Sequence, residues 1–315
     1  TKGTNFSNTA GFILLVFSDQ PKPEMVLLLV ITVIYVLTLM GNTSIMLVSH
    51  LSPKFQTLVY FFLSNLSFLD LCFTNSIVPQ MLWNLKGPEK TISYVGCVIQ
   101  LYMALGLGST ECVLLTVMAY DRFIAICWLL RYSVTMYPKL LQQLAMAWVS
   151  GFVGSTVQTI LVFQLPLCSH HTMDDFMCEE PALMKTACVD TTFENELAIA
   201  SVFFVVIPLG LILIFYGCIV RSCEGRRRAF ETCGSHLIIV VLFLGTVISV
   251  YIQPKSKYKQ NHSKFLTLFY TVVTPSLNLL IYTLRNKKVN WALKMLLVST
   301  QVKQKREILK LKILR

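Results

Sequence analysis

The sequence predicts an all-α membrane protein, a seven-transmembrane helix bundle followed by a short cytosolic amphipathic helix. Of its 315 residues, 55% are hydrophobic and only 14% are charged, and the mean hydropathy is +0.64. A soluble domain has a lower apolar share and about a quarter of charged residues. Two further observations support the prediction: the number of long apolar stretches, and the uneven distribution of Lys and Arg between them.

Seven stretches are apolar over the roughly 20 residues that a helix needs to cross a bilayer. They cover approximately residues 25–49, 57–82, 97–122, 140–163, 197–221, 233–253 and 265–284. The early apolar run at residues 11–17 is short and lacks a basic flank, so we expect no cleaved signal peptide. An odd number of crossings places the two termini on opposite sides of the membrane.

The basic residues orient the bundle, because cytosolic connections are enriched in Lys and Arg. Seventeen of the 27 lie in connections on the C-terminal side, and nine lie on the other side. We therefore expect an extracellular tail at residues 1–24, a transmembrane domain at 25–284 and a cytosolic tail at 285–315. The net charge of +11 is then mostly topological, with added attraction to anionic lipid, and nucleic acid is not an expected partner.

The first part of the cytosolic tail mixes lysines with large apolar residues, a pattern typical of a helix that lies on a membrane surface. We expect membrane lipid to contact it. The residues are Lys287, Lys288, Trp291, Leu293, Lys294, Leu296 and Leu297.

The predicted outer side lies in an oxidising compartment, where disulfides persist. Asn5-Phe6-Ser7 is a glycosylation sequon on the free tail, and we expect Asn5 to be used. Four outer cysteines permit three disulfide pairings. A zinc site that adds His170 and His171 is the alternative, although the paired close spacing of zinc ligands is missing. The outer cysteines are Cys97, Cys168, Cys178 and Cys188.

Ionisable residues occur at two levels of the predicted helices, where they are costly and usually functional. Asp70 and Glu111 have no nearby Lys or Arg, so they share a proton, bind a cation or meet water in a structural network. Asp121 and Arg122 lie at the basic end of the third helix. This pair either has a functional role or only anchors the helix end at the headgroups.

The segment MAYDRFIAIC, residues 118–127, resembles the rhodopsin-like G-protein-coupled receptors. Its continuation to Leu130-Arg131-Tyr132 is similar to the odorant-receptor branch. Each motif alone is weak, but five in register along seven spans identify the chain as a member of this family. The other four are Gly41-Asn42, FFLSNLSFLDLC at 61–72, RAFETCGSHL at 228–237 and PSLNLLIYTLRN at 275–286.

The resemblance implies an odorant receptor of the plasma membrane. Such a receptor binds a small, mostly neutral volatile molecule in the outer half of the bundle and activates a heterotrimeric G protein of the stimulatory olfactory type. It is not an enzyme. The resemblance also selects disulfides between Cys97 and Cys178 and between Cys168 and Cys188. The rival classes lack support, because a transporter or channel would show repeats or a polar path, and a hydrolase would need a nucleophile beside a base.

By the same resemblance, Arg122 pairs with Asp121 at rest and moves inward on activation, toward two tyrosines. Basic residues near the sixth helix look like the adjoining G-protein contact surface, although they also act as plain topological anchors. The residues assigned to this switch and contact surface are Asp121, Arg122, Tyr216, Arg228, His236 and Tyr282.

The family also suggests a role for the buried acids. Asp70 with Asn42, Glu111 and Asn278 looks like a sodium or protonation site that favours the inactive state. A wet structural hydrogen-bond network is the alternative. We expect no other cofactor.

Ligand recognition is expected in the outer halves of helices three, five, six and seven. Residues 104, 105, 108 and 109 share one helical face, and their small size leaves room. No charged group is expected to face the cavity, which favours a ligand held by shape and dispersion. Ordinary helix packing is the alternative. The predicted lining residues are Ala104, Leu105, Gly108, Ser109, Phe203, Val206, Ile207, Val247, Ile248 and Tyr251.

The second outer loop, Pro166 to Glu196, carries seven acids against one lysine, and the third outer loop is rich in lysine. Opposite charges on the two loops could latch a lid, but exposed pairs contribute little. We therefore expect a solvated surface. The charged residues are Asp174, Asp175, Glu179, Glu180, Lys185, Asp190, Glu194, Glu196, Lys255, Lys257, Lys259 and Lys264.

Leucine replaces an expected proline at three motif positions, Leu58, Leu129 and Leu279. Proline removes a backbone donor and kinks a helix. The seventh helix should therefore be straighter around Leu279 than is usual in the family, and we expect less efficient switching.

Overall fold

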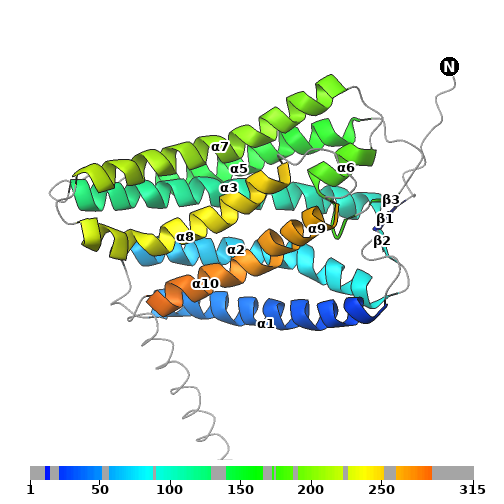
Figure 1. Cartoon of the computed structure of the whole chain (residues 1–315), viewed down its shortest axis with the longest axis horizontal. Coiled ribbons are helices and arrows are strands. Elements are labelled where there is room, and N and C mark those ends of the chain that lie inside the picture. The colour runs from blue at the N-terminus through cyan, green and yellow to red at the C-terminus, as the bar shows by residue number, and fades with distance from the viewer. Residues whose placement is uncertain are drawn as a thin grey trace, which may run out of the picture.

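The structure, a computed structural model, is built almost wholly of helices in the part of the chain that it describes. The long helices lie side by side along one direction, with three short strands gathered at one end (Figure 1). The described residues are 11–14, 21–51, 57–87, 90–128, 140–165, 172–173, 175–186, 191–222, 226–251 and 260–285.

Seven helical spans confirm the predicted bundle. Among the described residues, the first five spans are long and apolar enough to cross a membrane, and the sixth carries a shorter apolar stretch, His236–Ser249. The first six are α1 (Pro21–Leu51), α2 (Leu58–Lys86), α3 (Tyr94–Cys127), α5 (Leu140–Phe163), α7 (Thr191–Ser222) and α8 (Arg226–Tyr251). The seventh joins α9 (Gln260–Leu268), the π-helical turn η5 (Phe269–Val273) and α10 (Thr274–Arg285).

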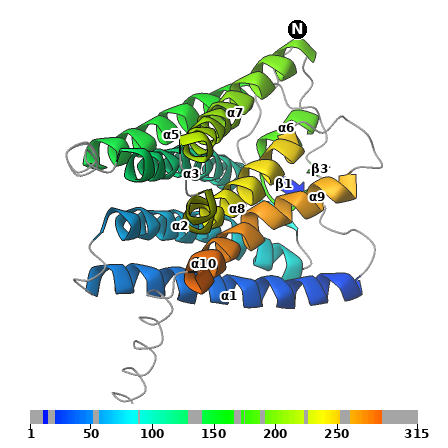
Figure 2. The ribbon, with the colours of Figure 1, turned by 60° about the vertical axis from the view of Figure 1, so that its left-hand side comes forward.

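The helix α3 is central to the bundle. It packs against α2, α5, α7 and α8, while α1 packs against α2 and α10, as the second view shows (Figure 2). Leu69, Leu114 and Val240 are almost fully buried in one apolar core that α2, α3 and α8 share. Apolar side chains on the outside of α1 and α5, such as Leu29 and Val153, are more than half exposed, as expected of a surface that faces lipid.

The helices α3 and α5 approach closely at small residues. A Cβ added to Gly151 would lie 2.2 Å from the hydroxyl oxygen of Thr110 and 2.9 Å from the carbonyl oxygen of Gly106. Four residues along α5, the Ser155 hydroxyl donates to the carbonyl oxygen of Tyr102 at 2.6 Å. Position 151 therefore requires glycine because a neighbouring backbone occupies the space of a side chain.

Gly151→Ala is expected to lower the melting temperature of the purified protein, because backbone atoms of α3 cannot move aside. Overpacking of this kind costs about 1–3 kcal/mol. Differential scanning fluorimetry measures the change. Gly217→Ala is the matched control, because among the described residues no heavy atom lies within 4 Å of a Cβ added there. Equal melting temperatures for the two variants would contradict the close approach.

Three short strands cover one end of the bundle. The strand β1 (Phe12–Leu14) lies in the middle, antiparallel to β2 (Thr91–Ile92) and parallel to β3 (Thr172–Met173). The side chains of Phe12 and Leu14 are buried. The N-terminal segment is therefore packed against the bundle at this point.

A disulfide holds the same end together. Cys97, near the start of α3, is bonded to Cys178, with 5.3 Å between their Cα atoms. Cys178 directly precedes Glu179 and the short helix α6 (Glu180–Thr186). We call this the disulfide end of the bundle, and the opposite end, where α3 carries Arg122, the arginine end.

The seventh span is deformed at η5. The N–H of Thr274 donates to the carbonyl oxygen of Phe269, five residues earlier. Pro275 follows and has no N–H, so the Thr271 carbonyl cannot take its usual helical partner, and a wider turn results. The helix α10 then continues through Leu279, as expected for leucine there. The deformation lies about two turns nearer the disulfide end than the missing proline.

Candidate functional site

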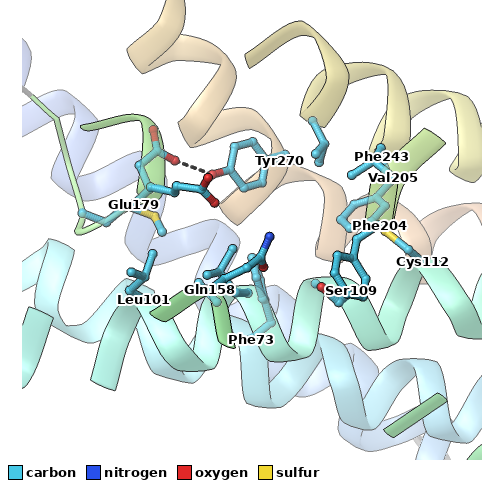
Figure 3. A pocket seen from close by; sticks show the side chains of 16 residues that line it. Phe73, Leu101, Ser109, Cys112, Gln158, Glu179, Phe204, Val205, Phe243 and Tyr270 are labelled. Atoms are coloured by element: carbon cyan, nitrogen blue, oxygen red, sulfur yellow. Dashed lines mark hydrogen bonds between the residues drawn. The ribbon is translucent and has the colours of Figure 1, made fainter. Parts of the chain in front are cut away.

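A pocket lies inside the bundle among α2, α3, α5, α7, α8 and η5, and the segment after Cys178 borders it at the disulfide end. The empty space between its walls, including the part that is open to solvent, measures about 680 Å³. Side chains from all of these elements point toward it (Figure 3). The lining is mostly apolar, with Phe73, Leu101, Met177, Phe204, Val205 and Phe243, and its polar members are Ser109, Gln158, Glu179, Glu180 and Tyr270.

The predicted face of α3 lines this pocket. Its four residues, 104, 105, 108 and 109, are all part of the wall, together with Cys112 one turn further on and Val247 of α8. Ile248 is partly buried but is not part of the wall. The side chains of Phe203 and Tyr251 lie outside the described part of the structure.

The predicted register of α7 is wrong. Val206 and Ile207 are 46% and 51% exposed on the outside of the bundle, whereas Phe204 and Val205 line the pocket. The ring of Phe204 lies against Gly154 of α5, where an added Cβ would be 2.5 Å from the ring. This glycine gives Phe204 the space to point inward.

The expectation that no charged group faces the cavity is also wrong. Glu179 lines the pocket with an exposed fraction of only 4%. Its carboxylate accepts hydrogen bonds from the Tyr270 hydroxyl at 2.5 Å and from the Thr267 hydroxyl at 3.1 Å, and the first of these is drawn in Figure 3. These bonds connect the loop after the disulfide to the seventh span.

The path of this loop explains why its acids are buried. Cys178 is bonded to α3, and its N–H donates to Oε1 of Gln100 at 2.9 Å, so the next residue enters the space between helices. Asp175 and Glu180 are buried too, as is Lys264 on α9. The predicted solvated surface is therefore wrong for these residues. The signal in the sequence was the position of Glu179 directly after a disulfide cysteine.

A buried polar network joins three helices at the middle of the bundle. The amide nitrogen of Asn278 lies 3.2 and 3.3 Å from the two oxygens of Asp70, and 3.3 Å from Oε1 of Glu111. Within the described residues, the amide oxygen of Asn278 and both amide atoms of Asn42 on α1 have no hydrogen-bond partner. The structure thus brings Asp70, Glu111 and Asn278 together, with Asn42 buried on the adjacent helix.

The arginine end holds the predicted switch residues. Nε of Arg122 lies 3.9 Å from Oδ2 of Asp121, which is the pairing expected at rest. The hydroxyl of Tyr216 and Nδ1 of His236 are hydrogen-bonded at 2.6 Å, and both side chains are buried. This bond links α7 directly to α8. The side chains of Arg228 and Tyr282 lie outside the described part.

Among the cysteines, the Cys97–Cys178 disulfide is present, as the resemblance implied. The second predicted disulfide, between Cys168 and Cys188, lies outside the described residues. Asn5, Leu129 and the amphipathic segment of the tail also lie outside them. Leu58 is buried against Ile124 of α3. Leucine at this departure from the family pattern therefore fills an interhelical contact.

Comparison with known proteins agrees with this geometry. A family model described as "Olfactory receptor" matches residues 31–300. The human protein "Olfactory receptor 2H2" is 54% identical over 301 residues, covering 93% of this chain and 96% of its own. The mouse protein "Olfactory receptor 2B6" is 53% identical, with the same coverage of each chain. The crystal structure of squid rhodopsin superimposes with a TM-score of 0.69 over 88% of this chain and 85% of that one, at 14% identity, which shows a shared fold.

The family match extends over most of the chain, and the relatives are identical at about half of all positions. Proteins of this family sense odorants from the plasma membrane as multi-pass signalling receptors, and they are not enzymes. The chain therefore belongs to the olfactory receptor family of G-protein-coupled receptors.

Proposed function

We propose that this receptor binds a small volatile molecule in the pocket near the disulfide end and activates a cytosolic G protein at the arginine end. The proposal rests on the observation that the same three helices connect the pocket to the arginine end. The helices α3, α7 and α8 line the pocket, and the same helices carry Arg122, Tyr216 and His236 at the other end. A ligand that repacks them on one side changes the contacts on the other.

The resting state is held by contacts at the arginine end. The bond between Tyr216 and His236 fixes α7 to α8, and Asp121 lies beside Arg122. A ligand shifts this equilibrium only as far as it binds one state better than the other. Activation separates α7 from α8, frees Arg122 and opens a groove for the G protein.

The distribution of charge supports the orientation of the receptor. Seventeen Lys and Arg residues lie in connections on the C-terminal side and nine lie on the other, which supports a cytosolic C-terminus. The disulfide end is then extracellular, where disulfides persist. The partner is a heterotrimeric G protein of the stimulatory olfactory type, so the signal is cyclic AMP. The transmembrane domain at residues 25–284 carries both the ligand site and the G-protein site. It lies between an extracellular tail at residues 1–24 and a cytosolic tail at 285–315.

The test is a cyclic-AMP assay in cells that coexpress the stimulatory olfactory G protein, with a panel of volatile compounds and surface display confirmed by biotinylation. We expect a concentration-dependent response to at least one compound, and none in cells displaying Arg122→Ala. A displayed receptor that responds to no compound in the panel, or an Arg122→Ala variant that responds normally, would contradict the proposal.

The buried network is a second candidate site, where we propose that a sodium ion or a proton stabilises the inactive state. The donor set fits sodium, because two carboxylates and two unpartnered amide oxygens are all hard oxygen ligands. Asp70, Glu111, Asn42 and Asn278 would hold the ion. When bound, the ion would offset one of the two negative charges of Asp70 and Glu111, which otherwise repel each other across one amide.

Asp70→Asn is expected to raise basal cyclic AMP about twofold or more and to remove any effect of sodium on agonist potency, because the variant has lost one of the two negative charges that favour the ion. A change of 0.4 kcal/mol in the resting equilibrium is enough for about a twofold shift. Concentration–response curves in sodium and in N-methylglucamine buffer measure this. A sodium effect of unchanged size in the variant would show that the network is only structural.

A further inference from the structure

The pocket is elongated, and its two ends differ in chemistry. Leu101 and Cys112 both line it, and their separation along α3 corresponds to about 16 Å. Glu179 and Leu101 lie toward one end, and Phe243 and Cys112 toward the other (Figure 3). A ligand that fills this space has one end against a carboxylate and the other against apolar side chains.

The carboxylate of Glu179 is fixed in position. Two hydroxyl donors, from Thr267 and Tyr270, hold it at 3.1 and 2.5 Å. An ionised carboxylate offers about four acceptor sites and no donor. These two hydrogen bonds therefore orient the group and leave acceptor capacity on the wall of the pocket.

The other polar side chains of the wall do not select for donors in the same way. Ser109 and Gln158 can each donate and accept, so they tolerate either kind of ligand group. Glu180 also lines the pocket, but it already has an interaction partner within the protein, so the preference for donors rests on Glu179. A ligand oxygen without a hydrogen would meet lone pairs at this end, and a buried acceptor left without a donor is costly.

We infer that the preferred ligand carries a hydrogen-bond donor, a hydroxyl or an ammonium group, at one end of an apolar body, and that this donor binds Glu179. The apolar body extends along α3 toward Cys112 and Phe243. This inference rests on the proposed function, because it specifies the ligand of the same pocket. It adds one directed polar contact to the ligand held by shape and dispersion that the sequence predicted.

The test uses a ligand series on the carbon skeleton of the most potent agonist from the volatile panel. The series contains the primary alcohol, the primary amine and the methyl ether, which lacks a donor. Affinity is measured by the shift in melting temperature of the purified full-length receptor, which does not require a G protein. We expect the alcohol or the amine to bind at least about tenfold more tightly than the ether, as a hydrogen bond to a charged group implies. An ether that binds as tightly as both overturns the inference.

Two variants assign the effect to Glu179. Glu179→Gln keeps the size of the side chain but removes its charge, so the preference over the ether should fall severalfold, more for the amine than for the alcohol. Glu24→Gln is the matched control, because it makes the same exchange at a residue of α1 that does not line the pocket and is paired with Lys90, so the preference should persist. If Glu179→Gln keeps the full preference for the alcohol or the amine over the ether, the ligand donor does not bind Glu179.

The outcomes separate the two proposals. A receptor that signals and binds all three compounds equally keeps its proposed function and loses this inference. A receptor that prefers donors by thermal shift but produces no cyclic AMP keeps the inference and loses the coupling proposal. Because the series on the unaltered receptor needs no variant, it decides the question even when Glu179→Gln is poorly displayed.

Discussion

Replacing Cys97 by serine is expected to remove the receptor from the cell surface. The Cys97–Cys178 disulfide spans a sequence separation of 81 residues, and closing a loop of this length stabilises a fold by roughly 4–5 kcal/mol in the chain-entropy description. The total stability of a folded domain is only about 5–15 kcal/mol. Without the disulfide, the segment that holds Glu179 between the helices is no longer attached to α3. The hydrogen bond between Glu179 and Tyr270 is then weakened together with the loss of the disulfide.

Surface biotinylation relative to total protein measures this effect. Cys218→Ser is the matched control, because Cys218 on α7 is a free and exposed thiol, so the same exchange breaks no bond there. Normal display of Cys97→Ser would contradict a structural role for the disulfide. Non-reducing peptide mapping provides an independent check, and a peptide that links Cys97 to Cys168 would disprove the pairing.

Gly108→Leu is expected to lower agonist potency by about ten- to hundredfold, which corresponds to the 1–3 kcal/mol that overpacking costs. Gly108 lines the pocket, and within the described structure no heavy atom lies within 4 Å of a Cβ added there. The leucine side chain therefore enters the space proposed for the ligand. It does not strain α3, because leucine favours a helix over glycine by about 0.8 kcal/mol.

The control for this prediction is Gly217→Leu on α7, where an added Cβ also meets nothing within 4 Å among the described residues and the position faces outward. Both variants should be displayed at parental levels. Cyclic-AMP curves at matched display then compare a pocket leucine with a surface leucine. Equal potency in the two variants would mean that the agonist does not occupy the pocket beside Gly108.

The seven spans could be predicted from the sequence because their signals are local. Apolar length marks each helix, and α5 begins and ends where the predicted stretch 140–163 does. The pocket face of α3 was also predictable, since small residues at 104 and 108 stand out against larger ones. Polar residues in apolar helices singled out Asp70 and Glu111, and the family resemblance grouped them with Asn278.

The inward face of α7 could not be predicted, because this helix is apolar on all sides in the sequence. Its register depends on contacts with other helices, such as that of Phe204 with Gly154. Glu179 was misplaced for a related reason. Local composition indicates a solvated acidic loop, whereas the burial of this residue depends on a disulfide to α3 and on Tyr270, which is 91 residues away.

The shape of the seventh span could be predicted from the sequence only in part. The missing proline at Leu279 indicated a helix that is straighter than usual around that position, and α10 extends over Thr274–Arg285. Pro275 was equally visible in the sequence, but its consequence for the carbonyl of Thr271 appears only in the turn η5. Because Tyr270 belongs to this turn and lines the pocket, the deformed segment lies beside the proposed ligand rather than near the arginine end.

Photolabelling tests whether the agonist binds inside the bundle. A photoreactive analogue of the first agonist is crosslinked to the displayed receptor, and the labelled peptides are mapped by mass spectrometry with and without excess agonist. We expect labels on α3 between Ala104 and Cys112 and on η5 at Tyr270, all removed by competition. Competed labels confined to the outer surface of α7, at Val206 and Ile207, would contradict it.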